Sequence, residues 1–179
     1  MTLFQDRIVR AAKLDVNLYE EVEADKTALG QAMAVVVLSS IAGGVGSIPR
    51  VGLSVSAILI GTAFSLVGWY VWAYLTYFIG TKFLPEPQTK ADTGELLRTI
   101  GFSSSPGLIR VIGIIPGLGT LVFLVAQVWM LVAMIIAVRQ ALDYESTLRA
   151  VGVCLIGWVI QFLFFMLLYS FVGGAPASA

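Results

Sequence analysis

The stretch that decides the fold is FSSSPGLIRVIGIIPGLGTLVFLVAQVWMLVAMIIAVRQAL, residues 102–142. It contains no acidic residue and is apolar almost throughout, with basic side chains only at Arg110 and Arg139. A helix needs about 20 residues to cross a hydrocarbon layer of about 30 Å, so this stretch is long enough for two crossings. Pro116 and Gly117 stand where the chain would turn back between them. We therefore expect an integral membrane protein.

The composition of the whole chain supports this expectation. Its 179 residues are 58% hydrophobic and only 12% charged, with a mean hydropathy of +0.91. A soluble domain carries about 25% charged residues, so lipid is the natural solvent for this chain. The net charge is zero, which gives no reason to expect nucleic acid as a partner.

Several kinds of chemistry are excluded by what the sequence lacks. There is no histidine, and Cys154 is the single cysteine, so histidine catalysis, most zinc sites and an intrachain disulfide are excluded. No glycine-rich phosphate loop followed by lysine is present. We predict that the protein is not an enzyme and that it uses no cofactor and no metal.

The apolar pattern predicts an all-α polytopic membrane protein with five transmembrane helices. Pro106 should kink the third helix, because proline removes a backbone hydrogen bond and clashes with the preceding turn. Asp92 and Glu95 have capping-box spacing and should start that helix. The expected parts are a polar N-terminal arm (1–27), the membrane domain (28–172) and a disordered tail (173–179). The other four crossings are expected at 28–45, 53–79, 118–138 and 150–172.

Small and aromatic residues refine the first two crossings. Ser39 and Gly43 are spaced four apart, which lets helices approach closely in lipid. A turn is expected at 46–50. The aromatic residues of segment 69–78 are expected to form a belt at the membrane interface rather than a ligand-binding cage.

The N-terminal arm has two predicted parts. Residues 2–15 form either an amphipathic helix in the headgroup region or a solvated arm. Residues 17–20 have capping-box spacing and start a short acidic helix with Leu18, Tyr19 and Val22 on one side. This side either packs on the membrane domain or receives a protein partner. The three residues are therefore our candidate partner-binding residues.

The basic residues predict the orientation. With five crossings, only Arg50 and Arg110 can face the side opposite the N-terminus. The positive-inside rule then places the N-terminus in the cytoplasm and the C-terminus outside, in the cell's inner (cytoplasmic) membrane. A rival topology makes 102–116 a re-entrant loop and leaves four crossings, but it moves more basic residues outside.

A few polar residues within the crossings are candidates for an intramembrane site. A cation inside a membrane segment marks function unless its long stem reaches the headgroups, and both interpretations of Arg110 stay open. Ser103, Ser104 and Ser105 precede Pro106 in a broken helix, which is either a structural kink or part of a transporter-like site. Gln127 and Gln161 either line a solute path or hydrogen-bond across helices.

Some residues carry a resemblance to a known family. The chain resembles the Yip domain family at six places. These are Arg7-Ile8-Val9-Arg10 and Leu18-Tyr19-Glu20-Glu21-Val22 in the polar arm, the Ser-Pro break at 102–106, Pro116-Gly117-Leu118-Gly119, residues 137–142 and Arg149-Ala150. The resemblance implies a prokaryotic-type member of these Ypt/Rab-interacting membrane proteins. It also implies a role in membrane organisation or trafficking. The cytoplasmic Asp-Leu-Tyr-Gly-Pro motif of eukaryotic relatives is replaced by Asn-Leu-Tyr-Glu-Glu at 17–21, so we carry over no Rab-binding site.

Two functions follow as hypotheses. The first is a non-enzymatic scaffold or partner-binding protein, with the lipid bilayer, a membrane or cytoplasmic protein, or a second copy as partners. The alternative is a transporter or channel for a small solute or ion. The absence of any Asp or Glu within the crossings argues against proton coupling.

Overall fold

The computed structural model describes the backbone of residues 2–173. It describes the side chains through Leu163 and, beyond that, the side chain of Met166. Every element within this range is helical, which confirms the all-α prediction. The elements are α1 (Leu3–Ala12), α2 (Val16–Ala24), η1 (Lys26–Ala28), α3 (Leu29–Val51), α4 (Val55–Phe78), η2 (Ile79–Phe83), α5 (Thr93–Phe102), η3 (Ser105–Ile114), α6 (Gly119–Ala141) and α7 (Thr147–Gly173). Most of the predicted tail lies outside the described residues.

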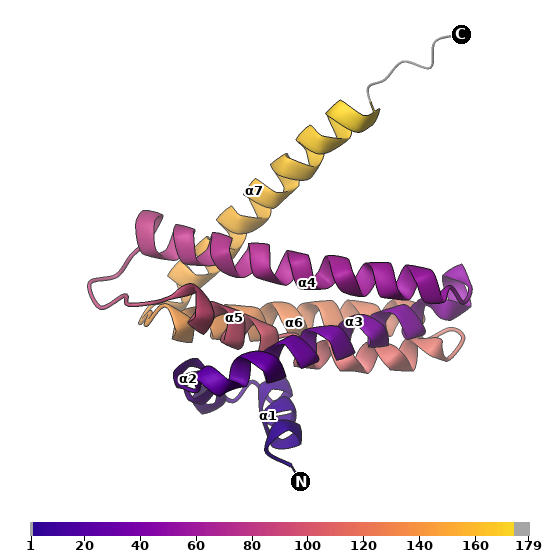
Figure 1. The fold of residues 1–179 in the computed structure, drawn as a ribbon, viewed down its shortest axis with the longest axis horizontal. Helices are drawn as coiled ribbons and strands as arrows, with labels where there is room; N and C mark the ends of the chain where they lie inside the picture. Colours follow the sequence, from indigo (N-terminus) through magenta and orange to yellow (C-terminus); the bar gives the residue numbers. More distant parts are fainter. Residues whose placement is uncertain (1, 174–179) are drawn as a thin grey trace.

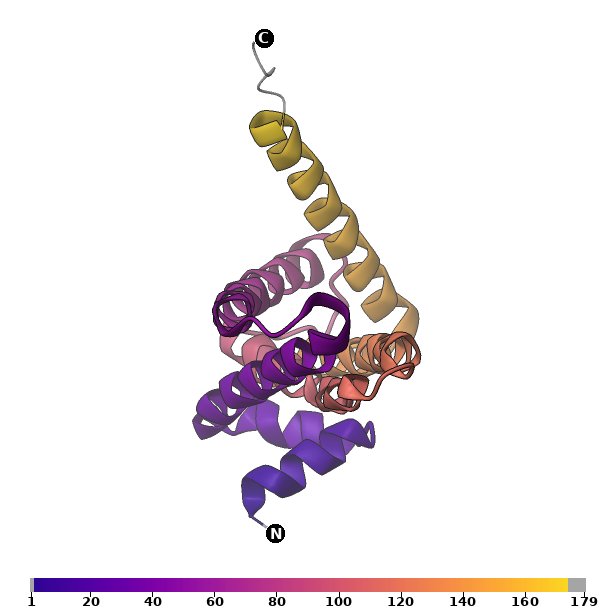
Figure 2. The same cartoon turned by 90° about the vertical axis from the view of Figure 1, so that its right-hand side faces the viewer.

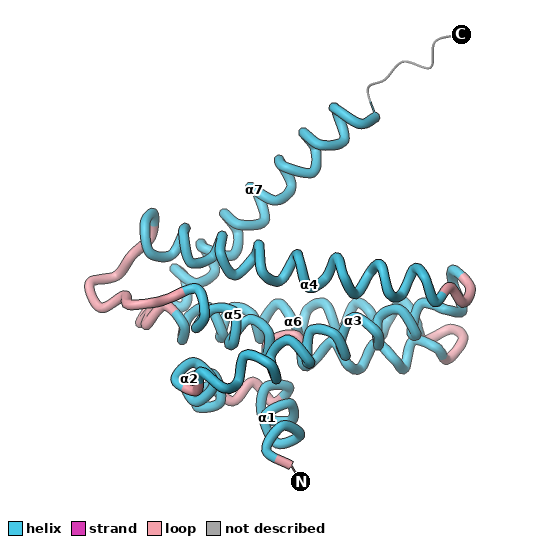
Figure 3. Tube along the Cα trace, in the orientation of Figure 1, coloured by secondary structure: helices cyan, strands magenta, loops and turns pink. Residues whose placement is uncertain are grey.

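Three described segments are long and apolar enough to span a membrane: Lys26–Val51, Val55–Phe83 and Gly119–Ala141. A shorter apolar helix covers Thr147–Leu163. These segments support a membrane protein, while the count of five crossings stays a prediction. Figures 1 and 3 show α3, α4 and α6 running alongside one another, with α7 leaving the group at an angle.

The first predicted turn is wrong, because residues 46–50 belong to α3. Pro49 falls in the last turn of the helix, and the chain turns instead at Gly52. Gly52 has φ +80°, a left-handed conformation that glycine adopts at low cost, and its N–H donates to the carbonyl of Ile48. The helix therefore runs past proline and ends at the next glycine able to reverse the chain.

The third predicted crossing is a broken helix. The capping box is confirmed: the Asp92 carboxylate accepts from the N–H of Glu95, and the Glu95 side chain accepts from the N–H of Asp92. α5 then ends at Phe102, and the chain continues as the 3-10 helix η3 with Pro106 in its first turn. The structure thus shows a break with a change of helix type at Ser103 and Ser104, and the kink predicted at Pro106 is not confirmed.

The length of this broken helix matches the bilayer. Ten residues of α-helix rise about 15 Å and ten of 3-10 helix about 20 Å, together close to the hydrocarbon thickness of about 30 Å. Loops 84–92 and 142–146 lie at one end of the long helices, and loops 52–54 and 115–118 lie at the other (Figure 1). Segment 93–114 therefore runs the length of the group rather than turning back.

Glycine brings η3 against α3. A Cβ built on Gly46 of α3 would overlap the backbone carbonyl of Arg110, and one built on Gly113 of η3 would lie 2.9 Å from the carbonyl oxygen of Gly46. A 3-10 helix leaves backbone polar groups poorly paired, and burial in protein is how membrane proteins tolerate such segments. Close backbone packing against α3 therefore holds η3 in place.

The N-terminal arm packs on the bundle. Leu18, Tyr19 and Val22 are fully buried in a core that also includes Phe102 and Ala137. Our candidate partner-binding residues are thus inaccessible in this structure, and the first alternative, packing on the membrane domain, is what the structure shows. The predicted cap is also wrong, because Asp15 rather than Asn17 caps α2.

Hydrogen bonds hold both arm helices. The indole N–H of Trp129 donates to the carbonyl of Ala12 at the end of α1, at 2.8 Å. Arg98 of α5 donates to the carbonyls of Val22 and Glu23 in the last turn of α2. α1 lies across the direction of the long helices (Figures 1 and 2). Both interpretations of residues 2–15, the headgroup helix and the solvated arm, stay predictions.

We expect Gly46→Ala to destabilise the fold by about 1–3 kcal/mol, because the added methyl forces η3 away from α3. Gly30→Ala is the matched control in the same helix, since nothing lies within 4 Å of a Cβ there. Thermal unfolding in detergent, followed by circular dichroism, measures both. Equal melting temperatures for the two variants would contradict the close backbone approach.

Candidate functional site

A cavity of about 330 Å³ lies among α3, α4, α5, η3, α6 and α7, and both polar and apolar side chains line it. Five of the six residues predicted for an intramembrane site line it: Ser103, Ser104, Arg110, Gln127 and Gln161. Its further lining includes three serines and three tryptophans: Ser39, Ser40, Ser65, Trp69, Trp72 and Trp158. Residues from six helical elements thus meet at one place midway along the long helices.

Arg110 points into the bundle. Its Nη2 donates to the carbonyl oxygen of Ser39 at 2.7 Å and to the Ser39 hydroxyl at 2.9 Å. Its Nε donates to the carbonyl of Gly107 at 3.0 Å. Ser39 is near the middle of α3, so the guanidinium turns away from the chain turn at 115–118. The direction of the guanidinium therefore favours the intramembrane interpretation of Arg110 over the headgroup anchor, and its role stays a prediction.

Two glycines make room for the guanidinium. A Cβ on Gly43 would lie 3.2 Å from Cζ and 3.3 Å from Nη1 of Arg110. A Cβ on Gly107 would overlap the Ser39 hydroxyl and approach Nη2 at 3.0 Å. The planar side chain thus occupies a slot between α3 and η3, where its hydrogen bonds fix its orientation.

The other predicted residues are placed differently. Gln127 and Gln161 make no side-chain hydrogen bond to another helix among the described residues, so the interhelical interpretation gains no support there. Ser103 donates to the carbonyl of Ile100 within its own helix. Ser105 does not line the cavity: it is 2% exposed, and its hydroxyl has no described partner.

Tryptophans form part of the wall, which sequence reasoning missed. Trp69 and Trp72 turn inward, so the predicted interfacial belt is wrong for these two residues. The Trp69 N–H donates to the carbonyl of Leu97, whereas the Trp72 N–H is enclosed without an acceptor in the described structure. The Ser65 hydroxyl donates to Ser40 at 3.1 Å and links α4 to α3. Ser65 could have been found from the sequence, because it lies with Gly61 and Gly68 on a face of α4 made of small residues.

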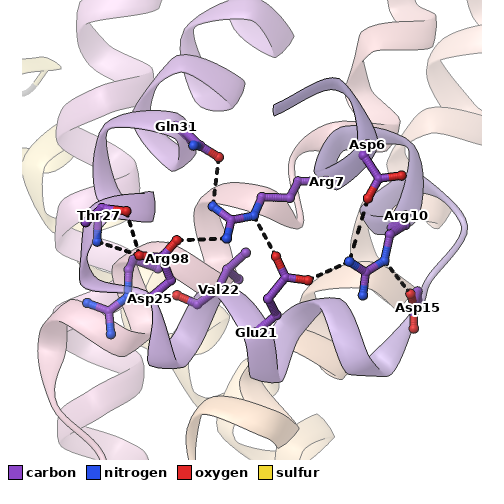
Figure 4. A network of polar contacts seen from close by, with 10 residues as sticks. All are labelled: Asp6, Arg7, Arg10, Asp15, Glu21, Val22, Asp25, Thr27, Gln31 and Arg98. Atoms are coloured by element: carbon purple, nitrogen blue, oxygen red, sulfur yellow. Dashed lines mark hydrogen bonds and ion pairs between the residues drawn. The ribbon is translucent and has the colours of Figure 1, made fainter. Parts of the chain in front are cut away.

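A separate ionic network holds the arm together (Figure 4). Arg7 is 4% exposed and pairs with Glu21 and Asp25, each at 2.8 Å, while its Nη1 donates to Gln31 at 3.0 Å. The hydrogen bond from Thr27, followed by that from Arg7, lowers the pKa of Asp25 to about 2. A fully paired buried arginine is costly to disrupt, so this network gives the arm one defined structure.

An acidic depression lies where the arm meets the loops. Glu20, Glu23, Glu95, Asp143 and Glu145 line it, with Arg139 among them. Burial, and then the nearby charges of Asp143, Glu95 and Glu20, raise the pKa of Glu23 to about 7. Among the residues with described side chains, no group of three or more metal-ligating residues has a metal-binding arrangement.

Long apolar helices around a shared cavity are typical of an α-helical membrane protein. A comparison with family models matches residues 18–169 to the Yip1 domain, and the chain belongs to this family. The resemblance seen in the sequence is thereby confirmed. Searches of curated proteins and of solved structures find no match.

We expect the raised pKa of Glu23 to make stability depend on pH. A carboxyl whose pKa rises on folding binds its proton more tightly in the folded state, so stability falls as pH increases from about 4.5 to about 7. Glu23→Gln should remove that part of the fall, as measured by melting temperature across this range. Asp6→Asn, the same charge change on α1, should leave the slope as in the wild type. An unchanged slope in Glu23→Gln would refute the assignment.

Proposed function

We propose that the protein is a non-enzymatic Yip-type protein of the cytoplasmic membrane that binds a small polar solute in its cavity and lets the solute cross. The observation that carries this proposal is the convergence of Ser103, Ser104, Arg110, Gln127 and Gln161 on one cavity. Polar groups within a bilayer are expensive, and they are retained where they line substrate or ion pathways.

The backbone around the cavity supports the same proposal. The break between α5 and η3 lies at Ser103 and Ser104, which are both lining residues. Transporters use broken helices in this way, because unwound backbone and helix ends offer polar groups to a solute. Serine hydroxyls and glutamine amides can hydrogen-bond to a polar solute larger than water, and indole rings can pack against it.

We further propose five crossings with the N-terminus in the cytoplasm. The arm and loops 84–92 and 142–146 share one end of the long helices, which supports this topology. That end carries most of the basic residues, as the positive-inside rule requires. Arg50 lies near the other end, with its guanidinium 4.2 Å from the ring centre of Phe123.

Solute flux tests the proposal. Purified protein in liposomes should raise the permeability to small polar solutes, assayed by light scattering after an osmotic jump with urea, glycerol and potassium salts. Gln127→Leu removes a polar group from the wall, and a lost contact of 1–2 kcal/mol predicts a flux about 5- to 30-fold lower. Gln140→Leu, whose amide pairs with Glu20 outside this cavity, should leave flux unchanged.

Two outcomes would overturn the transport proposal. One is a permeability equal to that of empty liposomes for every solute. The other is a Gln127→Leu variant that is folded and as permeable as Gln140→Leu. In either case transport would be rejected, and the scaffold function would take its place.

A membrane-organising scaffold is the second candidate, and the exposure of α4 favours it. In the most apolar 18-residue window of the α4 segment, 0% of the residues are buried within the chain. In the corresponding windows of the α3 and α6 segments, 33% and 22% of the residues are buried. Ile60, Phe64, Val67 and Val71 are each more than half exposed and recur at helical spacing. A second copy is the partner we propose for this face, because the N-terminal residues expected to bind a protein are buried.

Self-association in liposomes tests the scaffold candidate. We expect the double variant Phe64→Ala, Val71→Ala to raise the dissociation constant about tenfold, equivalent to 1.4 kcal/mol of lost packing. Leu124→Ala, Val128→Ala on the exposed face of α6 is the matched control. Energy transfer between labelled copies, measured against lipid dilution, reports the constant. Equal constants for the two double variants would exclude α4 as the interface.

A further inference from the structure

We propose that the ligand of the intramembrane cavity carries an oxyanion, such as a phosphate group, and that Arg110 binds it. This inference rests on the proposed function only in taking the cavity as a ligand site. It adds the chemical class of the ligand and the residue that selects it.

Charge is the first argument. Arg110 makes no ion pair among the described residues, and no Asp or Glu lines the cavity. By contrast, the buried Arg7 has two carboxylate partners. An unpaired charge in a low-dielectric interior is costly, and an anion bound beside it removes most of that cost. The cavity therefore favours a negative ligand over a neutral or positive one.

Unused donors are the second argument. Arg110 uses Nε and Nη2 to hold Ser39 and Gly107, but no described bond uses the two N–H groups of Nη1. Ser104 and Gln127 also line the cavity, and neither side chain makes a hydrogen bond among the described residues, so both are free to donate. The Trp72 N–H is fully enclosed and is therefore not available to a ligand. Donors in excess of acceptors are what an oxyanion, which only accepts hydrogen bonds, requires.

The third argument is that the guanidinium is already in position. Three hydrogen bonds and the slot made by Gly43 and Gly107 fix its plane before any ligand arrives. A ligand then meets an ordered fork and loses little affinity to ordering the side chain. Arginine suits this role better than lysine, because two bonds hold the backbone while the remaining nitrogen stays free.

Two sources of the oxyanion are compatible with the cavity. Trp158 is 39% exposed and Gln161 is also exposed, so α7 covers the cavity only in part. Figure 2 shows α7 leaning away from the other long helices. A phospholipid headgroup could enter from the bilayer through this side, and a free anion could enter from water. The chemistry at Arg110 is the same for both.

Binding to the full chain in dodecyl maltoside micelles, which carry no phosphate group, tests the inference. The first probe is radiolabelled inorganic phosphate, measured by equilibrium dialysis. The second is phosphatidylglycerol added to the micelles, with retained lipid counted by native mass spectrometry. We expect one of the two probes to bind at one molecule per chain. Binding of phosphate identifies a free anion, and retention of phosphatidylglycerol identifies a lipid headgroup.

Variants connect the binding to the cavity. Arg110→Gln should lower the affinity for the probe that binds by about 10- to 100-fold, as expected for the loss of a charge-assisted hydrogen bond of about 1.5–3 kcal/mol. Arg50→Gln removes the same charge from the far end of the bundle and should bind as the wild type does. Ser104→Ala removes only a hydroxyl from the cavity wall, and it should weaken binding about 3- to 10-fold. If Arg110→Gln fails to fold, Ser104→Ala decides the result.

The inference is overturned if the wild type binds neither probe, or if folded Arg110→Gln binds as Arg50→Gln does. It is also overturned if Arg110→Gln does not fold and Ser104→Ala binds as the wild type does. These outcomes are distinct from failure of the transport proposal. Flux of urea or glycerol without oxyanion binding would leave the transport proposal in place. Oxyanion binding without any flux would support the inference and reject transport.

Discussion

The structure depends on the close approach of one backbone to another, where η3 lies against α3 at Gly46. A side chain at this position would overlap the carbonyl of Arg110. In lipid no hydrophobic force draws helices together, so van der Waals packing through small residues supplies much of the attraction. The same contact shields the backbone of a 3-10 segment that could not face lipid alone. It also places Arg110 opposite Ser39, and so it creates the site.

A charge held by backbone carbonyls connects this packing to function. The Ser39 carbonyl and hydroxyl neutralise part of the guanidinium, which lets the arginine persist at mid-depth without a carboxylate. In our proposal, the remaining positive charge selects the ligand. A purely structural crosslink between α3 and η3 would need only the donors already used, whereas the free Nη1 of Arg110 exceeds that need. This excess is why a ligand site explains the cavity better than packing alone.

At the polar end of the molecule, charged side chains of the N-terminal arm are paired. There, Arg7 is enclosed by Glu21, Asp25 and Gln31, so its charge is fully used within the arm. Arg98 caps the carbonyls at the end of α2 and ties the arm to α5. The arm is therefore part of the folded domain. The acidic side chains of Glu20 and Glu23 line the depression beside the loops, whereas the apolar side chains of Leu18, Tyr19 and Val22 are buried.

By itself the sequence determined the class and most helix positions, since apolar runs and the capping box at Asp92 are local signals. It also identified the polar residues of the cavity, because a polar group is conspicuous in an apolar segment. Periodicity places Leu18, Tyr19 and Val22 on one face, but it cannot say whether that face meets a partner or the protein's own α5 and α6. Nor can it tell which way Arg110 points, or that Trp72 turns inward. Tertiary structure decided these points, because burial and direction depend on contacts between residues far apart in the chain, such as Ser39 and Arg110.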